Sequence, residues 1–196
     1  MVPLPSIRPA TTRDAAHLVV LIDIASEGLA SFLWQQIAAP DQSPLEVGRT
    51  RALRQTGSFN WRSAHIAERD GEVAGALIGY VIDEPPDPAE VAELGPLVRP
   101  LVALEAQAHG YWYVNVLAVY PEHRGSGVGT ALLRHADQLA GRSTAKGMAL
   151  IVASTNTGAR RLYERHGYRF AASEPTGATP DIELEGDWLL LLKPHS

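Results

Sequence analysis

A glycine-rich turn ahead of a helix is the feature of this sequence that most directly indicates chemistry. The run from Val119 to Thr130 reads Val-Tyr-Pro-Glu-His-Arg-Gly-Ser-Gly-Val-Gly-Thr and joins an apolar, strand-like segment to a helix-period pattern. At a helix N-terminus the backbone N–H groups point outward, and the helix dipole favours negative charge. Glycines leave this backbone bare, so that a diphosphate can approach it closely. The turn is therefore predicted to hold a phosphorylated cofactor.

The spacing of the glycines excludes two common nucleotide-binding motifs. A Walker loop needs Lys and then Ser or Thr after its last glycine, whereas Thr and Ala follow Gly129 here. A dinucleotide fingerprint needs G-x-G-x-x-G in an early βαβ unit, but the run 125–129 has another spacing and lies late in the chain. What remains is the pattern Arg-x-x-Gly-x-Gly, formed by Arg124, Gly127 and Gly129.

A second motif lies downstream of this turn. Residues 156–168 read Asn-Thr-Gly-Ala-Arg-Arg-Leu-Tyr-Glu-Arg-His-Gly-Tyr, with Asn156 suited to cap a helix and Gly167 suited to end it. The run Met148–Ala153 before it is apolar, as in a buried strand. In this order and separation, the two motifs resemble the pyrophosphate turn and the second signature of the GNAT-type N-acetyltransferases, which hold acetyl-CoA. The resemblance is strongest over Tyr111–Tyr168.

This resemblance implies a fold, a reaction and a set of binding residues. The implied fold is α/β, with a mixed, mainly antiparallel central sheet flanked by helices, in a single N-acetyltransferase domain over residues 1–196. The implied reaction moves an acetyl group from acetyl-CoA, a co-substrate, to a primary amine by direct attack on the thioester. A small-molecule amine is the first expectation for the acceptor, and no metal is implied. The residues expected to bind acetyl-CoA are Leu117, Ala118, Val119, Arg124, Gly125, Ser126, Gly127, Val128, Gly129, Thr130, Asn156 and Tyr163.

Members of this set have different expected roles. Backbone amides from Gly125 to Thr130 would bind the diphosphate, and Arg124 would add charge or pack. By resemblance, the strand end 117–119 pairs with the pantetheine arm, and its backbone polarises the thioester carbonyl, a type of contribution that is often the largest in catalysis. Tyr163 matches the position of the family's proton donor. A phenol with a reference pKa near ~10 stays protonated at neutral pH and can donate to a thiolate.

The sequence does not identify a general base. An acceptor ammonium with a pKa near ~10 must lose a proton before the amine attacks. By resemblance, some family members carry Glu five residues before the Asn of the second motif, but here that position is Ile151. The candidates left open are Asn115, acting through a water, and the titratable side chains Glu105, His109 and Asp181. Two alternatives therefore stay open: a non-catalytic acyl-CoA-binding or regulatory module, and an acetyltransferase for peptide or protein amines.

Composition limits the class of protein. A chain of 196 residues fits one domain with a full core, and 45% hydrophobic with 20% charged residues is typical of a soluble globular protein. There is no cysteine, which excludes disulfides, thiolate metal sites and a cysteine nucleophile. Without a membrane-span pattern or a leader-like start, the predicted location is cytoplasmic. A net charge of −5 without a basic stripe argues against nucleic acid as a partner.

Apolar periodicity and turn signals predict alternating strands and helices around these motifs. The predicted strands are residues 7–9, 63–68, 73–82, 111–119, 148–153 and 188–192. The predicted helices are residues 11–28, one within 45–55, 101–108 and one that follows the glycines from 128. Thr11 and Asp14 have capping-box spacing, and Asp70-Gly71 is a strong hairpin signal. The run Trp188–Leu192 is expected to be a core strand or the edge of a homodimer.

Residues 83–110 depart from the usual family outline, in which a short hairpin joins the flanking strands. The segment 83–93 has no basic residue and carries five acidic ones: Asp83, Glu84, Asp87, Glu90 and Glu93. This segment is Pro-rich, and a helix is predicted after it. One hypothesis is that the insert borders the acceptor cleft and attracts a cationic amine. The other is a solvated loop or a dimer contact.

Overall fold

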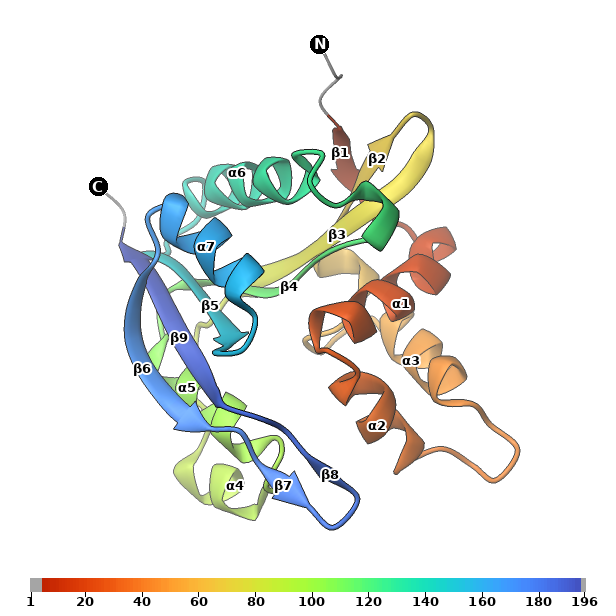
Figure 1. Cartoon of the computed structure of the whole chain (residues 1–196), viewed down its shortest axis with the longest axis vertical. Coiled ribbons are helices and arrows are strands. Elements are labelled where there is room, and N and C mark those ends of the chain that lie inside the picture. The colour runs from red at the N-terminus through yellow and green to blue at the C-terminus, as the bar shows by residue number, and fades with distance from the viewer. Residues whose placement is uncertain (1–4, 195–196) are drawn as a thin grey trace. The chain divides into compact units, whose positions relative to one another are not determined.

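The chain has a mixed α/β fold built on a mainly antiparallel sheet, as the resemblance implies. The structure is a computed structural model that describes residues 5–194 (Figure 1). Seven strands form one sheet in the order β1-β2-β3-β4-β5-β9-β6, and β7 and β8 form a separate ribbon. Backbone contacts divide the chain into two compact units. Unit 1 comprises Met1–Gly79 and Asn115–Ala136, and unit 2 comprises Tyr80–Val114 and Asp137–Ser196.

The first three strands of unit 1 pair antiparallel along the chain. They are β1 (Ser6–Pro9), β2 (Ala64–Arg69) and β3 (Glu72–Val81), whose last residues belong to unit 2. In the register of β1 on β2, Ser6 lies opposite Glu68. The β2–β3 turn has positive φ at Asp70 (53°) and Gly71 (84°). Two left-handed residues in a two-residue turn match the right-handed twist of a hairpin, so the Asp-Gly prediction is confirmed.

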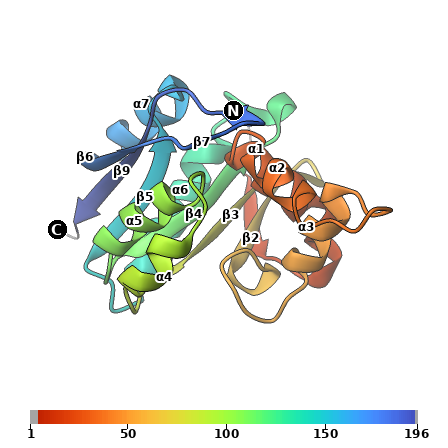
Figure 2. The same ribbon diagram turned by 90° about the horizontal axis from the view of Figure 1, so that it is seen from below.

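The helices of unit 1 pack beside one another, and both views show α1, α2 and α3 as one group (Figures 1 and 2). The helices before β2 are η1 (Thr12–Asp14), α1 (Ala15–Ala25), α2 (Leu29–Gln35), α3 (Pro44–Ala52) and the short η2 (Trp61–Ser63). Their apolar side chains join those of the strands in one buried cluster, which includes Leu18, Leu21, Ile22, Trp34, Val47, Ile66, Ile78 and Val116. This cluster forms the core of unit 1.

The first predicted helix, residues 11–28, forms as η1 and α1 but ends at Ala25, and α2 was not predicted. Helix α1 ends because Glu27 and Gly28 both adopt left-handed backbone, with φ of 54° and 89°. Helix α2 is held instead by tertiary packing, since the Trp34 ring lies against Gly48 of α3. A Cβ at Gly48 would lie 2.6 Å from that ring, so only glycine allows this approach. A seven-residue helix stabilised in this way leaves little periodicity in the sequence.

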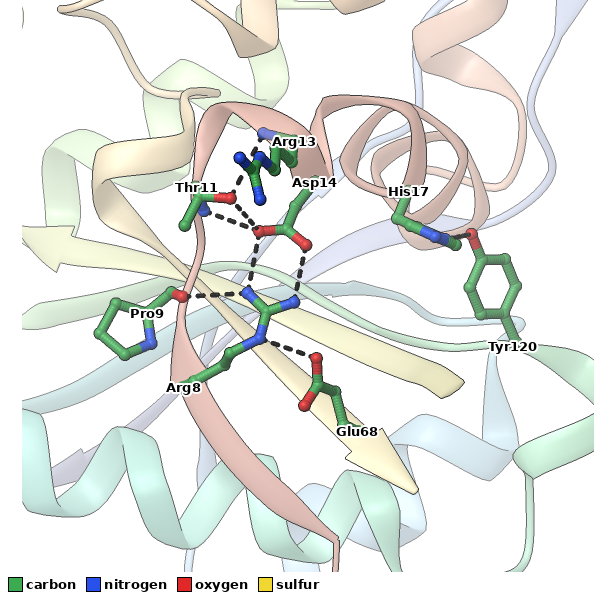
Figure 3. A network of polar contacts seen from close by, with 8 residues as sticks. All are labelled: Arg8, Pro9, Thr11, Arg13, Asp14, His17, Glu68 and Tyr120. Atoms are coloured by element: carbon green, nitrogen blue, oxygen red, sulfur yellow. Dashed lines mark hydrogen bonds and ion pairs between the residues drawn. The ribbon is translucent and has the colours of Figure 1, made fainter. Parts of the chain in front are cut away.

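A partly buried ion-pair network fixes the start of unit 1, as Figure 3 shows. The Arg8 guanidinium donates two hydrogen bonds to Asp14, at 2.8 and 2.9 Å, and its Nε donates to Glu68 at 2.7 Å. Asp14 also accepts from the backbone and the hydroxyl of Thr11, at 2.7 and 2.9 Å. The predicted capping box is therefore present. Because the guanidinium joins η1 to both β1 and β2, the network links local helix capping to the sheet.

We expect Asp14→Asn to destabilise the fold in a pH-dependent way. The Arg8 hydrogen bonds lower the pKa of Asp14 from 3.8 to about 2, against the opposing effect of burial. A carboxylate whose folded pKa is depressed stabilises the fold above its unfolded pKa and loses this effect as the pH falls toward 2. The substitution should lower the free energy of unfolding by about 2 kcal/mol at pH 7. Urea unfolding should show this difference shrinking between pH 4 and pH 2.

Asp70→Asn is the matched control for this experiment. Asp70 is 75% exposed and lies 3.6 Å from Arg69, and Asn tolerates its positive φ. An ion pair at 3.6 Å whose carboxylate is exposed contributes little, so its removal should change stability by less than about 0.5 kcal/mol. Equal losses from Asp14→Asn and Asp70→Asn would contradict the role given to this ion-pair network.

Three elements pass from one unit into the other. These are β3, β4 (Trp112–Val119) and α6 (Val128–Ala140), whose ends fall in different units. The remaining strands of unit 2 are β5 (Gly147–Ala153), β6 (Arg169–Pro175), β7 (Ala178–Thr179), β8 (Ile182–Glu183) and β9 (Asp187–Pro194). Strand β9 lies between β5 and β6 and pairs antiparallel with both, whereas residues 112–114 of β4 pair parallel with β5.

The insert of unit 2 forms two helices instead of the single one that the sequence predicts. These are α4 (Pro88–Glu93) and α5 (Arg99–Gln107), which lie side by side (Figure 2). Asp87 caps α4 by accepting from the Ala89 amide at 2.8 Å. This short helix was not predicted because it has no buried residue and so leaves no apolar periodicity in its acidic sequence. Helix α5 packs against β5, β6 and β9.

Among residues 5–194, no single helix is long and apolar enough to cross a membrane. Two consecutive helical segments, Thr12–Ala25 and Leu29–Gln35, reach the length and apolar composition of a membrane span only when they are taken together. They are bent by 112° relative to each other.

Candidate functional site

The predicted anion-binding turn lies in unit 1, between β4 and α6. After β4 the chain forms a short helix, η3 (Pro121–His123), and then the glycine-rich turn. Gly125 and Gly127 both adopt left-handed backbone, with φ of 72° and 89°. A Cβ built on either glycine would meet no atom within 4 Å. These glycines are therefore required by the backbone conformation, and the space above them is open.

The backbone of this turn presents hydrogen-bond donors. The Gly127 carbonyl accepts from the Ala131 amide at 3.0 Å, which makes it the first intrahelical bond of α6. The amides of residues 128–130 belong to the first helical turn, where no carbonyl of the helix can accept from them. Gly125 and Gly127 are exposed, and Gly129 and Thr130 are half-buried. Open space beside Gly125 and Gly127, next to the amides of a helix N-terminus, fits a diphosphate.

Side chains around the turn hold it in place. Arg124 donates from Nε to the Val119 carbonyl at 3.3 Å, so its guanidinium folds back on the end of β4. Of the two roles predicted for Arg124, this contact matches packing. The Ser126 hydroxyl donates to the His123 carbonyl, and Arg69 donates from Nη1 to the Ser126 carbonyl at 3.5 Å. Arg69 brings positive charge to the turn from the β2–β3 hairpin, a contribution that no local motif indicates.

Tyr120 fixes the entry to the turn (Figure 3). Its hydroxyl lies 2.9 Å from Nδ1 of His17 on α1, and the two rings meet edge to face at 5.9 Å. Its amide donates to the Ala74 carbonyl of β3 at 2.9 Å. Burial raises the pKa of the phenol, with Glu122 adding to the effect, so the hydroxyl stays protonated. The turn is thus attached to both α1 and β3 at the residue after β4.

The residues at the end of β4 are partly or fully buried. Ala118 is buried, and Leu117 and Val119 are half-buried. Strand β3 approaches this segment closely, because a Cβ at Gly75 would lie 2.5 Å from the Ala118 carbonyl oxygen. Any larger residue at position 75 would displace that carbonyl. The expectation that residues 117–119 act through their backbone agrees with this burial and remains a prediction.

The second motif lies in unit 2 and forms α7 (Thr157–Arg165). Asn156 caps it by accepting from the Ala159 amide at 3.1 Å, and Gly167 ends it with φ of 90°. Both expectations for the helix ends are confirmed. Tyr163 is buried in this unit, 7% exposed, with its ring 5.9 Å from that of Tyr168. The role of Asn156 as a coenzyme contact remains a prediction.

Burial controls the acid–base chemistry available to Tyr163. It raises the pKa of the phenol from 10.0 to about 12. The hydroxyl is therefore fully protonated at neutral pH and available as a donor. Outright transfer of its proton to a thiolate with a pKa near ~8.5 would be uphill, so the side chain is best suited to stabilise a thiolate by hydrogen bonding.

The candidates for a general base lie in different environments. In unit 1, the Asn115 amide donates to the Ser58 carbonyl at 3.5 Å. In unit 2, Nε2 of His109 lies 2.8 Å from the Asp83 carbonyl oxygen, and the exposed Asp181 lies in the turn between β7 and β8. Glu105 of α5 is half-buried. The four candidates therefore differ in burial and in hydrogen bonding, a difference that sequence spacing alone does not show.

Comparisons with known proteins identify the family. The model of the acetyltransferase (GNAT) family matches residues 31–168. The chain belongs to this family. N-alpha-acetyltransferase 40 of Saccharomyces cerevisiae is 35% identical over 150 residues, which cover 72% of this chain and 47% of that protein. The chain therefore spans about half the length of the curated relative it matches.

Solved structures share the fold at low sequence identity. An N-acetyltransferase from Staphylococcus aureus Mu50 aligns with a TM-score of 0.63 and 18% identity, covering 95% of this chain and 99% of that one. A GNAT family acetyltransferase from Elizabethkingia anophelis, solved with acetyl-CoA bound, aligns with a TM-score of 0.50 and 17% identity over 67% and 75% of the two chains. The predicted fold class is confirmed by these likenesses.

Proposed function

We propose that the chain is an acetyl-CoA-dependent N-acetyltransferase that moves the acetyl group to a primary amine by direct attack on the thioester. The observation that carries this proposal is the glycine turn at the N-terminus of α6, where a Cβ on Gly125 or Gly127 would meet no atom within 4 Å. The amides of residues 128–130 that follow have no carbonyl partner within the helix. Acetyl-CoA would supply the activated acetyl group. The turn would bind its diphosphate, with Arg69 adding positive charge nearby.

In the proposed reaction, Tyr163 donates a hydrogen bond to the leaving thiolate. Its buried phenol holds a proton throughout the neutral range, so it can donate a hydrogen bond where negative charge develops. Asn156 caps the same helix, and the family resemblance gives it a contact with the coenzyme. A non-catalytic acyl-CoA-binding module would have no use for a donor at this position.

The distribution of charged residues supports the proposal that the acceptor is a cation. Unit 1 has nine acidic and nine basic residues, whereas unit 2 has thirteen acidic and eight basic residues and so carries the whole net charge. Two segments of unit 2 have five acidic residues each and no basic one: residues 83–93 and residues 174–187. Gly177 of the second segment lies against Pro96, three residues after the end of the first, in contact too close for a Cβ. An acidic surface of this kind attracts an ammonium group.

Two acceptor classes fit this charge. A small-molecule amine is the first candidate, as the sequence predicts. The second is the α-amine of a peptide or protein, which the name of the yeast relative, N-alpha-acetyltransferase 40, favours. The two classes differ in pKa, because an α-amine has a reference value near ~8 and a lysine-type amine one near ~10.4. At neutral pH an α-amine is therefore partly deprotonated and needs less help from a base.

A coenzyme A release assay tests the proposal. The purified chain would receive acetyl-CoA with polyamines, amino acids, a peptide with a free N-terminus, and the same peptide with a blocked N-terminus and one lysine. Acetylation of any of these amines, verified by mass spectrometry, is the expected result. Binding of acetyl-CoA without transfer to any amine would favour the non-catalytic module.

We expect neutral substitutions in the acidic insert to weaken acceptor binding. The triple variant Glu84→Gln/Glu90→Gln/Glu93→Gln removes three exposed charges and keeps Asp87, which caps α4. The KM for a cationic amine should rise about 3- to 10-fold and depend less on salt, because screened attraction between charges would be lost. The KM for acetyl-CoA should not rise. Steady-state kinetics at 20 and 200 mM salt measure both.

A control with the same change of net charge comes from unit 1. The variant Asp41→Asn/Asp70→Asn/Glu72→Gln also removes three exposed acidic groups. It should leave the acceptor KM and its salt dependence unchanged. If both triple variants behave alike, or if deleting residues 85–93 changes nothing, the insert is a solvated loop or a dimer contact.

A further inference from the structure

A cation from the β2–β3 hairpin lies against the backbone of the glycine turn. Arg69 is the last residue of β2, and its Nη1 donates to the Ser126 carbonyl at 3.5 Å. The two residues are 57 positions apart in the chain, and both belong to unit 1. The Arg69 side chain is only 17% exposed, and within the described part of the chain its one ion pair is with the exposed Asp70, at 3.6 Å. Pairing this weak does not explain why a guanidinium is held there.

The hairpin that carries Arg69 is itself attached to the chain just before the turn. The Ala74 carbonyl of β3 accepts from the Tyr120 amide at 2.9 Å. Next to it, Gly75 lies so close to the Ala118 carbonyl of β4 that a Cβ would not fit. With the guanidinium contact, three contacts therefore join this hairpin to the end of β4 and the turn that follows. Arg69 thus reaches the turn from a backbone that is already fixed beside it.

The carbonyl that Arg69 contacts shares a peptide group with the amide of Gly127. In a trans peptide the C=O and N–H bonds point in opposite directions, and residues 5–194 contain no cis peptide bond. A guanidinium that holds the Ser126 carbonyl toward the hairpin therefore turns the Gly127 N–H away from the hairpin. No backbone carbonyl of the described residues accepts from this amide, and a Cβ on Gly127 would meet no atom within 4 Å. The contact with Arg69 thus leaves the Gly127 amide available to a ligand.

Local forces alone do not fix the orientation of this peptide group. Ser126 lies between Gly125 and Gly127, which both adopt left-handed backbone, with φ of 72° and 89°. Because glycine populates positive and negative φ about equally, a peptide group next to glycine can rotate with little steric resistance. The Ser126 hydroxyl donates to the His123 carbonyl, which holds the side chain of Ser126. Its carbonyl is held by Arg69, a contact between distant segments.

We propose that Arg69 is a positioning residue that orients the Ser126–Gly127 peptide group, so that the Gly127 amide donates to the diphosphate of the coenzyme. This inference rests on the proposed binding of acetyl-CoA at the glycine turn. Arg69 acts before the ligand arrives, because an amide that already points outward needs no reorganisation on binding. This role differs from the attraction that a positive charge exerts at a distance, which salt screens.

The test compares Arg69→Met with Arg134→Gln. Methionine keeps an apolar chain in place of the Arg69 stem and removes the guanidinium. Arg134 is an exposed cation of α6, so its replacement makes the same change of net charge beside the same helix. Arg69→Met should raise the Kd and the KM for acetyl-CoA about 10-fold, the effect of losing one hydrogen bond to a charged group, and leave kcat unchanged. Arg134→Gln should leave all three constants unchanged.

Salt dependence and NMR separate orientation from attraction. At ~1 M salt the Debye length is only about 3 Å, so a loss of long-range attraction disappears, whereas a loss of peptide orientation stays. The weaker binding of Arg69→Met should therefore persist from ~0.05 M to ~1 M salt. Without ligand, the Gly127 amide resonance should shift in Arg69→Met and keep its position in Arg134→Gln. Arg69→Lys keeps both a donor and the charge, and it should recover most of the lost affinity.

Folding and the proposed function are checked separately from this inference. A cooperative thermal transition verifies the fold of Arg69→Met, and Arg69→Gln takes its place, with the same expected results, if that variant does not fold. If the wild type binds acetyl-CoA and the variant binds it equally well, or loses affinity only at low salt, this inference alone is overturned. A wild type that does not bind acetyl-CoA would overturn the proposed function and this inference with it.

Discussion

Tyr163→Phe is expected to lower turnover by about 10²-fold while leaving acetyl-CoA affinity unchanged, the effect of losing one donor to developing negative charge. The substitution keeps the ring and its 5.9 Å contact with Tyr168, so the packing of unit 2 should survive. Only the hydroxyl is lost, and its pKa of about 12 means that it was protonated throughout the assay range. The measurements are kcat from coenzyme A release and Kd from calorimetry.

Tyr168→Phe is a closely matched control. Tyr168 is 1% exposed, lies against Tyr163, and has no hydrogen-bond partner for its hydroxyl among the residues that the structure describes. Removing an unsatisfied buried hydroxyl should leave kcat unchanged and cost no stability. Undiminished turnover in Tyr163→Phe would remove that residue from the reaction. Equal losses in both variants would indicate a packing effect instead.

Local sequence signals predicted those parts of the fold that local physics controls. The Thr11–Asp14 capping box, the Asp70-Gly71 hairpin and the two ends of α7 depend on side chains and φ values within a few residues of one another. All of these formed as predicted. The glycine turn belongs to the same class, because its left-handed residues and helix start are set within one short run.

The features that the sequence did not predict depend on contacts between distant segments. Helix α2 is held by Trp34 against Gly48 of α3, and α4 is a short, exposed helix in an acidic run. The same applies to the site. Arg69 reaches the turn from a hairpin more than fifty residues away, and no spacing rule relates the two segments. Sequence alone treats Glu105 as one candidate base among four, and the different environments of the four appear only in the structure.

Gly127→Ala is expected to weaken acetyl-CoA binding by about 10²-fold while the protein stays folded. The new Cβ would meet no protein atom within 4 Å, so it would project into the open space above the amides of α6. A diphosphate held off by that methyl group would lose about two charge-assisted hydrogen bonds, each worth about 1.5 kcal/mol, which corresponds to this change in Kd. Calorimetry measures the affinity directly.

Gly57→Ala separates this effect from backbone strain. Gly57 also belongs to unit 1, has a φ of 96° against 89° for Gly127, and would place its Cβ in equally open space. Both substitutions force an L-residue into the left-handed region, at a cost of about 1 kcal/mol, so both should lower Tm of the free protein similarly. Only Gly127→Ala should change Kd. If the two variants bound acetyl-CoA equally well, the methyl group would not lie in the path of a ligand.

Binding of acetyl-CoA to the wild-type protein can be observed at the backbone amides of the glycine turn. At a ligand concentration of one hundred times Kd, acetyl-CoA should stabilise the fold by about 2.7 kcal/mol, which raises Tm by about 5 to 10 °C for a chain of this size. Amide resonances of residues 125–130 should shift in solution NMR, and those around Gly57 should not. Because every later step of the proposed reaction needs the coenzyme held at this turn, a wild type that shows neither response would remove the physical basis for transfer.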